Sequence, residues 1–351
     1  MTVIINILIF IVMLGFIVFV HEFGHFTWAK ICGVYVYEFA IGMGPKLWSH
    51  KGKETEYSIR AIPLGGFCAM AGEDVDDDDV KKIPKSKRLQ AKNPFQRFLI
   101  MFFGAGNNFI SAFLLLFLIA LIWGGSTMDP VITAVQEGTP AYEAGLTKGD
   151  KILKIDDHNI ISSDDVTLYL ALSDHTKKTT FTVENSNGDK EVIKVKPEKT
   201  KIDGQETYIF GISLVQKKTH GFVASLKYMV DKGNGLFRQM WITVKYLFTG
   251  KVSINQLSGP VGIYSIVGSQ REAGIAALLF LTAYLSINVG FINLLPLPAF
   301  DGGHILFILI EILRFGKPVD PKVENYIHTA GMILLLLLML YVTVHDIIRL
   351  F

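Results

Sequence analysis

The chain is poor in charge and in cysteine. Of its 351 residues, 19% are charged, against about 25% in an average soluble domain. Its two cysteines, Cys32 and Cys68, cannot build a disulfide framework. The net charge of +2 excludes the strongly basic field with which many proteins attract nucleic acid. Apolar residues make up half of the sequence and the mean hydropathy is +0.38, so we expect a membrane protein with a substantial water-exposed part.

Four apolar stretches are long enough to cross a bilayer as helices, which takes about 20 residues. They are residues 3–20, 98–123, 275–297 and 331–344, and the last can extend upstream to residue 327. The third stretch is interrupted, because Pro296 and Pro298 remove backbone donors, and its apolar pattern resumes at residues 304–313. Irregular backbone at membrane depth is tolerated only where it is buried in protein or lines a cavity. We therefore expect the interruption to lie near a site.

Lysine and arginine are concentrated in two short loops. One run lies between residues 81 and 97, and the other between residues 314 and 322. Because positive loops stay in the cytoplasm, both loops are predicted to be cytoplasmic. The two termini and the long segment 124–274 are then extracytoplasmic.

Part of that long segment has a different pattern. From about residue 128 to residue 214, short β-rich runs alternate with turn signals, and two helical stretches lie near 141–144 and 164–172. This predicts one small α+β domain. Residues 217–274 follow with an amphipathic pattern, which we expect to lie along the outer membrane surface. A helix packed on the α+β domain would show the same pattern, and the sequence does not choose between the two.

The strongest chemical signal is His21-Glu22-Phe23-Gly24-His25. On a helix, residues four apart share a face, so the two imidazoles can hold one Zn²⁺ while the glutamate beside them acts as general base. A catalytic zinc has three protein ligands and an open position. Asp301 follows the interrupted span in Asn293-Leu294-Leu295-Pro296-Leu297-Pro298-Ala299-Phe300-Asp301-Gly302-Gly303, and we expect it to be the third ligand. His304 is a competing candidate.

Taken together and in this order, these features resemble the site-2 protease family, most closely its bacterial RseP type. Residues 139–146 with 148–152 resemble a PDZ domain. The stretch from Gly42-Met43-Gly44-Pro45 through Gly66-Phe67 resembles the family's membrane-associated β-loop. Residues 258–263 resemble the family's segment before the third span, and Asn108 matches an asparagine of its second span. The chain departs from the family pattern at Phe300 and at Phe103-Gly104-Ala105.

The resemblance implies a polytopic α-helical membrane protein of the bacterial plasma membrane, with the active site near the cytoplasmic side. Residues 1–123 would hold the first two spans, the zinc motif and the β-loop. Residues 124–216 would form an extracytoplasmic PDZ domain, 217–274 the membrane-surface segment, and 275–351 the broken third span and the fourth. The implied partners are the bilayer, an extended peptide at the PDZ domain and single-span membrane proteins, with no nucleic acid. The PDZ-like domain could equally be a plug that only limits access.

The implied activity is zinc-dependent cleavage of a peptide bond within the membrane, in substrates such as anti-sigma factors or signal-peptide remnants that another protease has already cut outside. The substrate would add as a strand to an edge at residues 56–66, although this stretch could also be a plain cytoplasmic hairpin. Its implied contacts are Asn288, Asn293, Pro298, Gly42 and Gly44, although the two asparagines could equally make helix–helix hydrogen bonds. An inactive PDZ-bearing membrane adaptor is the alternative function, and the retained Glu22 disfavours it. A metal transporter is disfavoured because the sequence shows no internal repeat.

Overall fold

A computed structural model describes residues 2–73, 78–202, 205–214, 217–250 and 259–349. The chain divides into two compact units. The first comprises residues 1–115 and 253–351, and the second comprises residues 116–252. The boundary falls inside helix α2 (Pro94–Trp123), which begins in the first unit and ends in the second.

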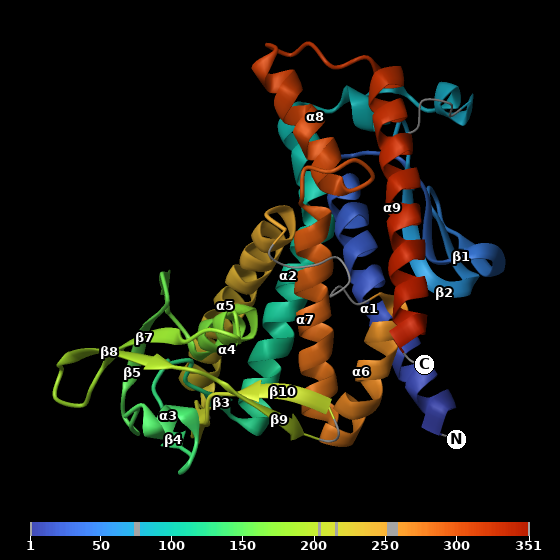
Figure 1. Cartoon of the computed structure of the whole chain (residues 1–351). Coiled ribbons are helices and arrows are strands. Elements are labelled where there is room, and N and C mark those ends of the chain that lie inside the picture. The colour runs from blue at the N-terminus through green and yellow to red at the C-terminus, as the bar shows by residue number, and fades with distance from the viewer. Residues whose placement is uncertain (1, 74–77, 203–204, 215–216, 251–258, 350–351) are drawn as a thin grey trace. The chain divides into compact units, whose positions relative to one another are not determined.

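The first unit is mainly helical (Figure 1). Four helical stretches in the described part of the chain are long and apolar enough to cross a membrane: Thr2–Ile31, Pro94–Trp123, Ile275–Asn293 and Lys322–Ile348. They coincide with the expected spans. Besides α2, the α-helices among the described residues of this unit are α1 (Thr2–Ile31), α6 (Pro260–Ala273), α7 (Ile275–Asn293), α8 (Asp301–Leu313) and α9 (Pro321–Arg349). Helix α6 was not expected, and Ser258, which begins the family-like segment before it, lies outside the described residues.

The interruption of the third span is present in the structure. Helix α7 ends at Asn293, and α8 begins only at Asp301. The connecting loop contains Ala299 with φ +74, a left-handed conformation that L-residues adopt at a cost in free energy. In Figure 1, α8 follows α7 beyond this short loop. The loop therefore delivers Asp301 to the first turn of a new helix.

Strands β1 (Val36–Lys51) and β2 (Glu56–Met70) form one antiparallel sheet that bends back on itself. Residues 56–59 pair on one side with 48–51 and on the other with 38–41, while residues 66–70 pair with the outer side of 36–41. The expectation of a free edge at 56–66 is therefore wrong for its first half, because residues 56–59 are central. Among the described strands, the edge toward α1 is formed by residues 66–70.

Glu38 holds the middle of this sheet through polar contacts. Its carboxylate accepts hydrogen bonds from Ser58 Oγ at 2.5 Å and from Arg60 Nη2 at 2.8 Å. Burial alone would raise the pKa of Glu38, but these hydrogen bonds and the charges of Arg60 and Lys46 outweigh it and lower the pKa. The charged form of Glu38 is therefore part of the folded sheet.

The second unit contains a four-stranded antiparallel sheet in the order β6-β5-β7-β8, with buried Phe181 at the centre of its core. A capping box between Ser162 and Asp165 begins helix α4. The strands and helices that the structure describes in this unit are β3 (Gly125–Ser126), β4 (Ala134–Val135), α3 (Pro140–Glu143), β5 (Lys151–Ile155), β6 (His158–Asn159), α4 (Ser163–Leu172), β7 (Thr179–Glu184), β8 (Lys190–Val195), β9 (Glu198–Ile202), β10 (Gln205–Ile209), β11 (Ile212–Ser213), β12 (Lys218–Thr219) and α5 (Phe222–Phe248). An α+β unit was expected here.

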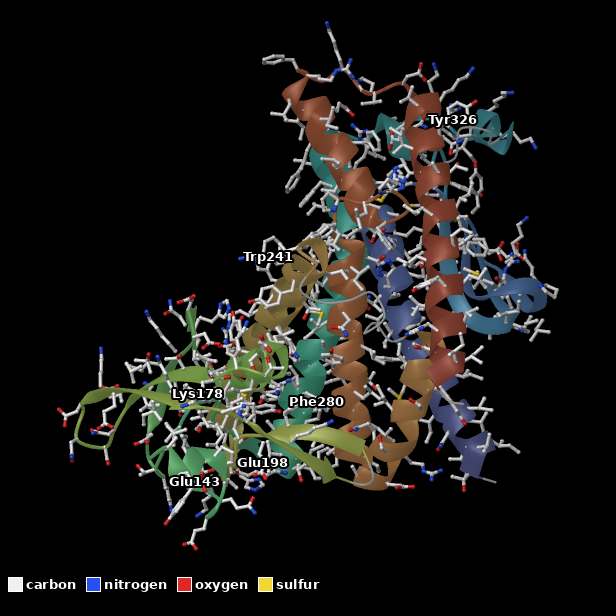
Figure 2. The ribbon with its side chains drawn as sticks, viewed as in Figure 1. Glu143, Lys178, Glu198, Trp241, Phe280 and Tyr326 are labelled. Atoms are coloured by element: carbon white, nitrogen blue, oxygen red, sulfur yellow. The ribbon has the colours of Figure 1, made fainter. Side chains whose placement is uncertain are left out.

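Helix α5 packs on α4 through charged groups. Lys232 Nζ lies 2.7 Å from Asp164 Oδ1, and Arg238 Nη2 lies 3.3 Å from Asp165 Oδ2. The opposite side of α5 carries exposed apolar side chains, among them Trp241, which is 63% exposed and labelled in Figure 2. The expected segment 217–274 is thus divided: α5 belongs to the α+β unit, and α6 belongs to the helical unit.

Candidate metal centre

His21, His25 and Asp301 come together in the first unit. The Nε2 atoms of the two histidines are 3.3 Å apart, and Asp301 Oδ2 and Oδ1 lie 3.3 and 3.4 Å from His21 Nε2 and His25 Nε2. The three side chains are between 9 and 15% exposed. Helical spacing aligns the histidines on α1, and the start of α8 supplies the carboxylate.

These spacings fit zinc. Zn–N and Zn–O bonds of about 2.0–2.1 Å in tetrahedral geometry place neighbouring ligand atoms about 3.3 Å apart. Two imidazoles and a carboxylate are also a donor set that zinc accepts, and they leave a fourth position open. Asp301 Oδ2 is buried and has no hydrogen-bond donor among the described residues. A buried carboxylate oxygen without a donor is costly unless a cation satisfies it.

Each histidine is oriented through its second ring nitrogen. His25 Nδ1 donates to the backbone carbonyl of Ile100 at 2.9 Å, which leaves the lone pair of Nε2 free for a metal. His21 Nδ1 lies 3.3 Å from the side-chain amide of Asn108, whose Oδ1 is otherwise buried without a partner. With the amide turned so that Oδ1 faces the ring, Nδ1–H donates to it and Nε2 of His21 is likewise free.

Two glycines make room for the cluster. A Cβ atom on Gly104 of α2 would overlap the imidazole of His25 and would lie 3.0 Å from Asp301 Oδ2. A Cβ on Gly24 of α1 would collide with the backbone carbonyl of Phe103. These positions let α1 and α2 approach closely enough for the Ile100 carbonyl to reach His25.

Glu22 lies beside the three ligand residues and next to the edge of the sheet. A Cβ on Gly66 would stand 3.3 Å from Glu22 Cγ. Glu22 is not part of the cluster of ligand atoms, which is formed by His21, His25 and Asp301. Glu22 thus lies between the two ligand histidines in sequence and packs against the sheet at Gly66.

The residues predicted to contact substrate lie in two other places. Gly42 and Gly44 adopt φ values of +88 and +82 within β1, and a Cβ on Gly42 would lie 2.7 Å from the carbonyl of Ile62. Asn288 is on α7, and its buried Oδ1 has no hydrogen-bond partner within the described part of the chain. Asn293 is the last residue of α7, and Pro298 lies in the following loop. Their roles in substrate binding stay predictions.

His304, the competing ligand, is not in this cluster. It forms a separate group with Glu324 and His328 of α9. Sequence reasoning gave no role to Gly104, to the Ile100 carbonyl or to His328. A backbone carbonyl leaves no signal in a sequence. Gly104 could have been noticed, because glycine is unfavourable inside a helix unless close packing requires it.

Comparison with known proteins agrees with this geometry. The sequence matches Peptidase family M50 over residues 9–338. It is 39% identical to a protein of Fusobacterium nucleatum named "Putative zinc metalloprotease FN1322", over 98% of this chain and 99% of that protein. It is 38% identical to a protein of Clostridium perfringens with the same designation, over 95% of both chains. A Staphylococcus aureus protein, again so designated, is 32% identical over 100% of both chains. The chain belongs to peptidase family M50, the site-2 proteases, and is a membrane zinc metalloprotease.

Proposed function

We propose that this protein is an endopeptidase that cleaves the membrane-spanning segment of single-span proteins, after an extracytoplasmic protease has shortened them. The observation that carries this is the cluster of His21, His25 and Asp301, with ligand atoms 3.3–3.4 Å apart and Glu22 beside them. Two of the ligands stand on a helix apolar enough to cross a membrane, and the third begins the helix that follows another such span after a short loop.

His21, His25 and Asp301 would hold the zinc, which when bound supplies Lewis-acid chemistry by activating water and polarising the scissile carbonyl. Glu22 takes a proton from the attacking water and gives it to the leaving amide nitrogen, so that one water is consumed for each peptide bond broken. The Ile100 carbonyl and the Asn108 amide keep the two imidazoles in the tautomer that presents Nε2 to the metal.

The substrate must be extended when it is cut, because a helix encloses its carbonyls in hydrogen bonds. Strand residues 66–70 are the edge beside Glu22, and their outer backbone groups suit addition of a substrate strand. Asn288 and Asn293 would satisfy backbone groups that the unwound substrate exposes. This arrangement supports substrate binding at the 66–70 edge.

The second unit supports a role in substrate selection. A groove of about 1100 Å³ runs between α4 and residues 207–214, with Val166, Leu170, Tyr208 and Ile212 among its apolar lining. An extended peptide, such as the end that the first protease exposes, would bind there as a PDZ ligand does. The lysine- and arginine-rich loops, at residues 81–97 and 314–322, would be cytoplasmic. The second unit and both termini would then be extracytoplasmic, and the zinc would lie near the cytoplasmic side.

The test uses the full-length chain in detergent and two forms of a single-span substrate, one with and one without its extracytoplasmic domain. We expect cleavage of the shortened form within its apolar segment, located by mass spectrometry and abolished by a zinc chelator. Glu22→Gln protein prepared in parallel controls for contaminating proteases. Cuts only outside the apolar segment, or cuts that persist in Glu22→Gln, would contradict the proposal.

A further inference from the structure

The loop between α7 and α8 holds an unfavourable backbone conformation close to a metal ligand. Ala299 has φ +74, and Asp301 follows two residues later. Helix α8 has no side-chain cap at its first residue, since Phe300 occupies the N-cap position. Local sequence therefore does not hold Asp301 in place, and contacts from elsewhere must do so.

Helix α9 supplies those contacts although it contributes no ligand. His328 Nδ1 accepts a hydrogen bond from the backbone N–H of Ala299 at 3.2 Å. A Cβ on Gly331 would run into Pro298, and one on Gly303 would lie 3.1 Å from His328 Cε1. His328 and Gly331 are three residues apart and share one face of α9.

The remaining surroundings of His328 favour a fixed ring. Its ring stacks on that of His304 with centroids 3.9 Å apart and planes at 12°, and His304 Nδ1 lies 3.5 Å from Glu324 Oε1. Glu324 lies one turn before His328, whereas Tyr326, labelled in Figure 2, is 75% exposed on another face of α9. The stack holds the imidazole so that Nδ1 faces the loop.

His304, Glu324 and His328 have ligand atoms within 4.8 Å of one another, so a second metal at this cluster has to be considered. The stacking argues against it. Imidazole lone pairs lie in the ring plane, so two nearly parallel rings one above the other do not point at a common ion. In addition, Nδ1 of His328 accepts from Ala299, so the neutral ring carries its proton on Nε2; that atom is buried without a partner among the described residues, but it then has no lone pair for a metal.

We propose that His328 is a positioning residue: its Nδ1 fixes the Ala299 peptide and thereby presets Asp301 for zinc. The proposal rests on the proposed role of Asp301 as a ligand. Without the hydrogen bond, Ala299 is free to leave its left-handed conformation, and the carboxylate loses its alignment with the two imidazoles. Groups that orient metal ligands typically contribute about 10–100-fold in metal affinity, and we expect about tenfold for a group acting through the backbone.

Two substitutions separate the hydrogen bond from the ring. His328→Phe keeps the aromatic stack on His304 but has no acceptor, while His328→Asn loses the stack but places an oxygen near the position of Nδ1. The zinc dissociation constant of each full-length variant is measured by competition with a chromogenic chelator. His345→Phe, on the same helix where His345 stacks on Tyr341, is the matched control.

We expect His328→Phe to bind zinc about tenfold more weakly, and His328→Asn and His345→Phe to bind like the parent. Adding Ala299→Gly to His328→Phe should restore part of the affinity, because glycine adopts positive φ without help. Weak zinc binding in His328→Asn with normal binding in His328→Phe would overturn the proposal, since it would show that the ring itself matters. Equal zinc affinities of His328→Phe and His328→Asn would also overturn the proposal, and so would the loss of a second zinc ion from both variants.

Failure of the proposed ligand set would look different. Asp301→Ala is measured in the same series, and it must lose zinc if Asp301 is a ligand. If Asp301→Ala binds zinc like the parent, the proposed function fails at that point. If it loses zinc while His328→Phe does not, only the positioning role of His328 fails.

Discussion

Gly104→Ala should empty the metal centre without unfolding the protein. The new methyl group would overlap the His25 imidazole and lie 3.0 Å from Asp301 Oδ2, whereas carbon atoms in proteins pack at about 3.5–4.0 Å. His25 cannot move aside without lengthening its 2.9 Å hydrogen bond to Ile100, which is on the same helix as Gly104. The imidazole and the methyl group therefore cannot both keep their places.

The expected loss of zinc affinity is larger than for removal of a group that only orients a ligand. Removing a group that merely orients a ligand costs about 10–100-fold in metal affinity, so displacing His25 itself should cost at least about 100-fold. The helix should not suffer, because alanine is favoured over glycine by about 1 kcal/mol inside a helix. The two effects are separable: zinc binding falls while the metal-free fold is retained.

The assay is zinc content by elemental analysis after gel filtration, together with the melting temperature of the metal-free protein. Gly106→Ala is the matched control on α2, since its Cβ would meet only ring carbons of Phe103 and Phe102 at 3.2 and 3.3 Å. Rings at that distance can shift by a few tenths of an ångström. Normal zinc content in Gly104→Ala would refute the placement of His25 and Asp301 around a common metal.

Three further predictions concern the ligand loop, an ion pair and the sheet. Asp301→Ala should lose zinc and cleavage together, checked by elemental analysis and a substrate assay; retained zinc would mean another third ligand. Arg97 Nη2 donates to both carboxylate oxygens of Glu311, at 2.6 and 2.7 Å, and this ion pair joins α2 to α8. Glu311→Ala should therefore lower the free energy of unfolding by about 3–5 kcal/mol, as measured in denaturant. The double substitution Arg97→Met with Glu311→Leu should lower it by less, because it leaves no unpaired charge. The pKa of Glu38 is lowered in the folded sheet from its ordinary value of 4.5. The charged carboxylate therefore stabilises the fold at pH above 4.5, and this stabilisation is lost as the pH falls through the pKa of the folded protein. When the pH is lowered through this range, the melting temperature of Glu38→Gln should therefore fall less steeply than that of the parent.

Much of the architecture could be predicted from the sequence. Long apolar stretches are unambiguous, and Pro296 with Pro298 marks the break before Asp301. The spacing of His21 and His25 fixes a shared helical face, so the residues of the candidate metal centre could be proposed from local pattern and chemical type.

What the sequence did not reveal depends on long-range packing. Helix α6 mixes Ser265, Gly268, Ser269 and Arg271 with apolar residues, so it shows no clear periodicity. The pairing of β9 with β10 was not expected, because lysine and threonine alternate in β9 where apolar residues would have marked a strand. The edge of the first sheet was misplaced because β1 pairs with two separate parts of β2.

The contacts that orient the metal ligands were hidden for the same reason. Ile100 acts through its carbonyl, and His328 lies 27 residues after Asp301 on another helix. Neither position carries a local motif. Such residues emerge only when the fold has brought α2 and α9 against the ligand-bearing segments.

The central claim is that Glu22 moves the proton while His21, His25 and Asp301 hold the metal. The most direct test measures zinc content and cleavage of a single-span substrate side by side, in the parent and in Glu22→Gln. We predict that both proteins carry a single zinc per chain and that only the parent cleaves. Turnover retained in Glu22→Gln would contradict the proton-transfer role, and loss of zinc from Glu22→Gln would show that Glu22 belongs to the ligand set.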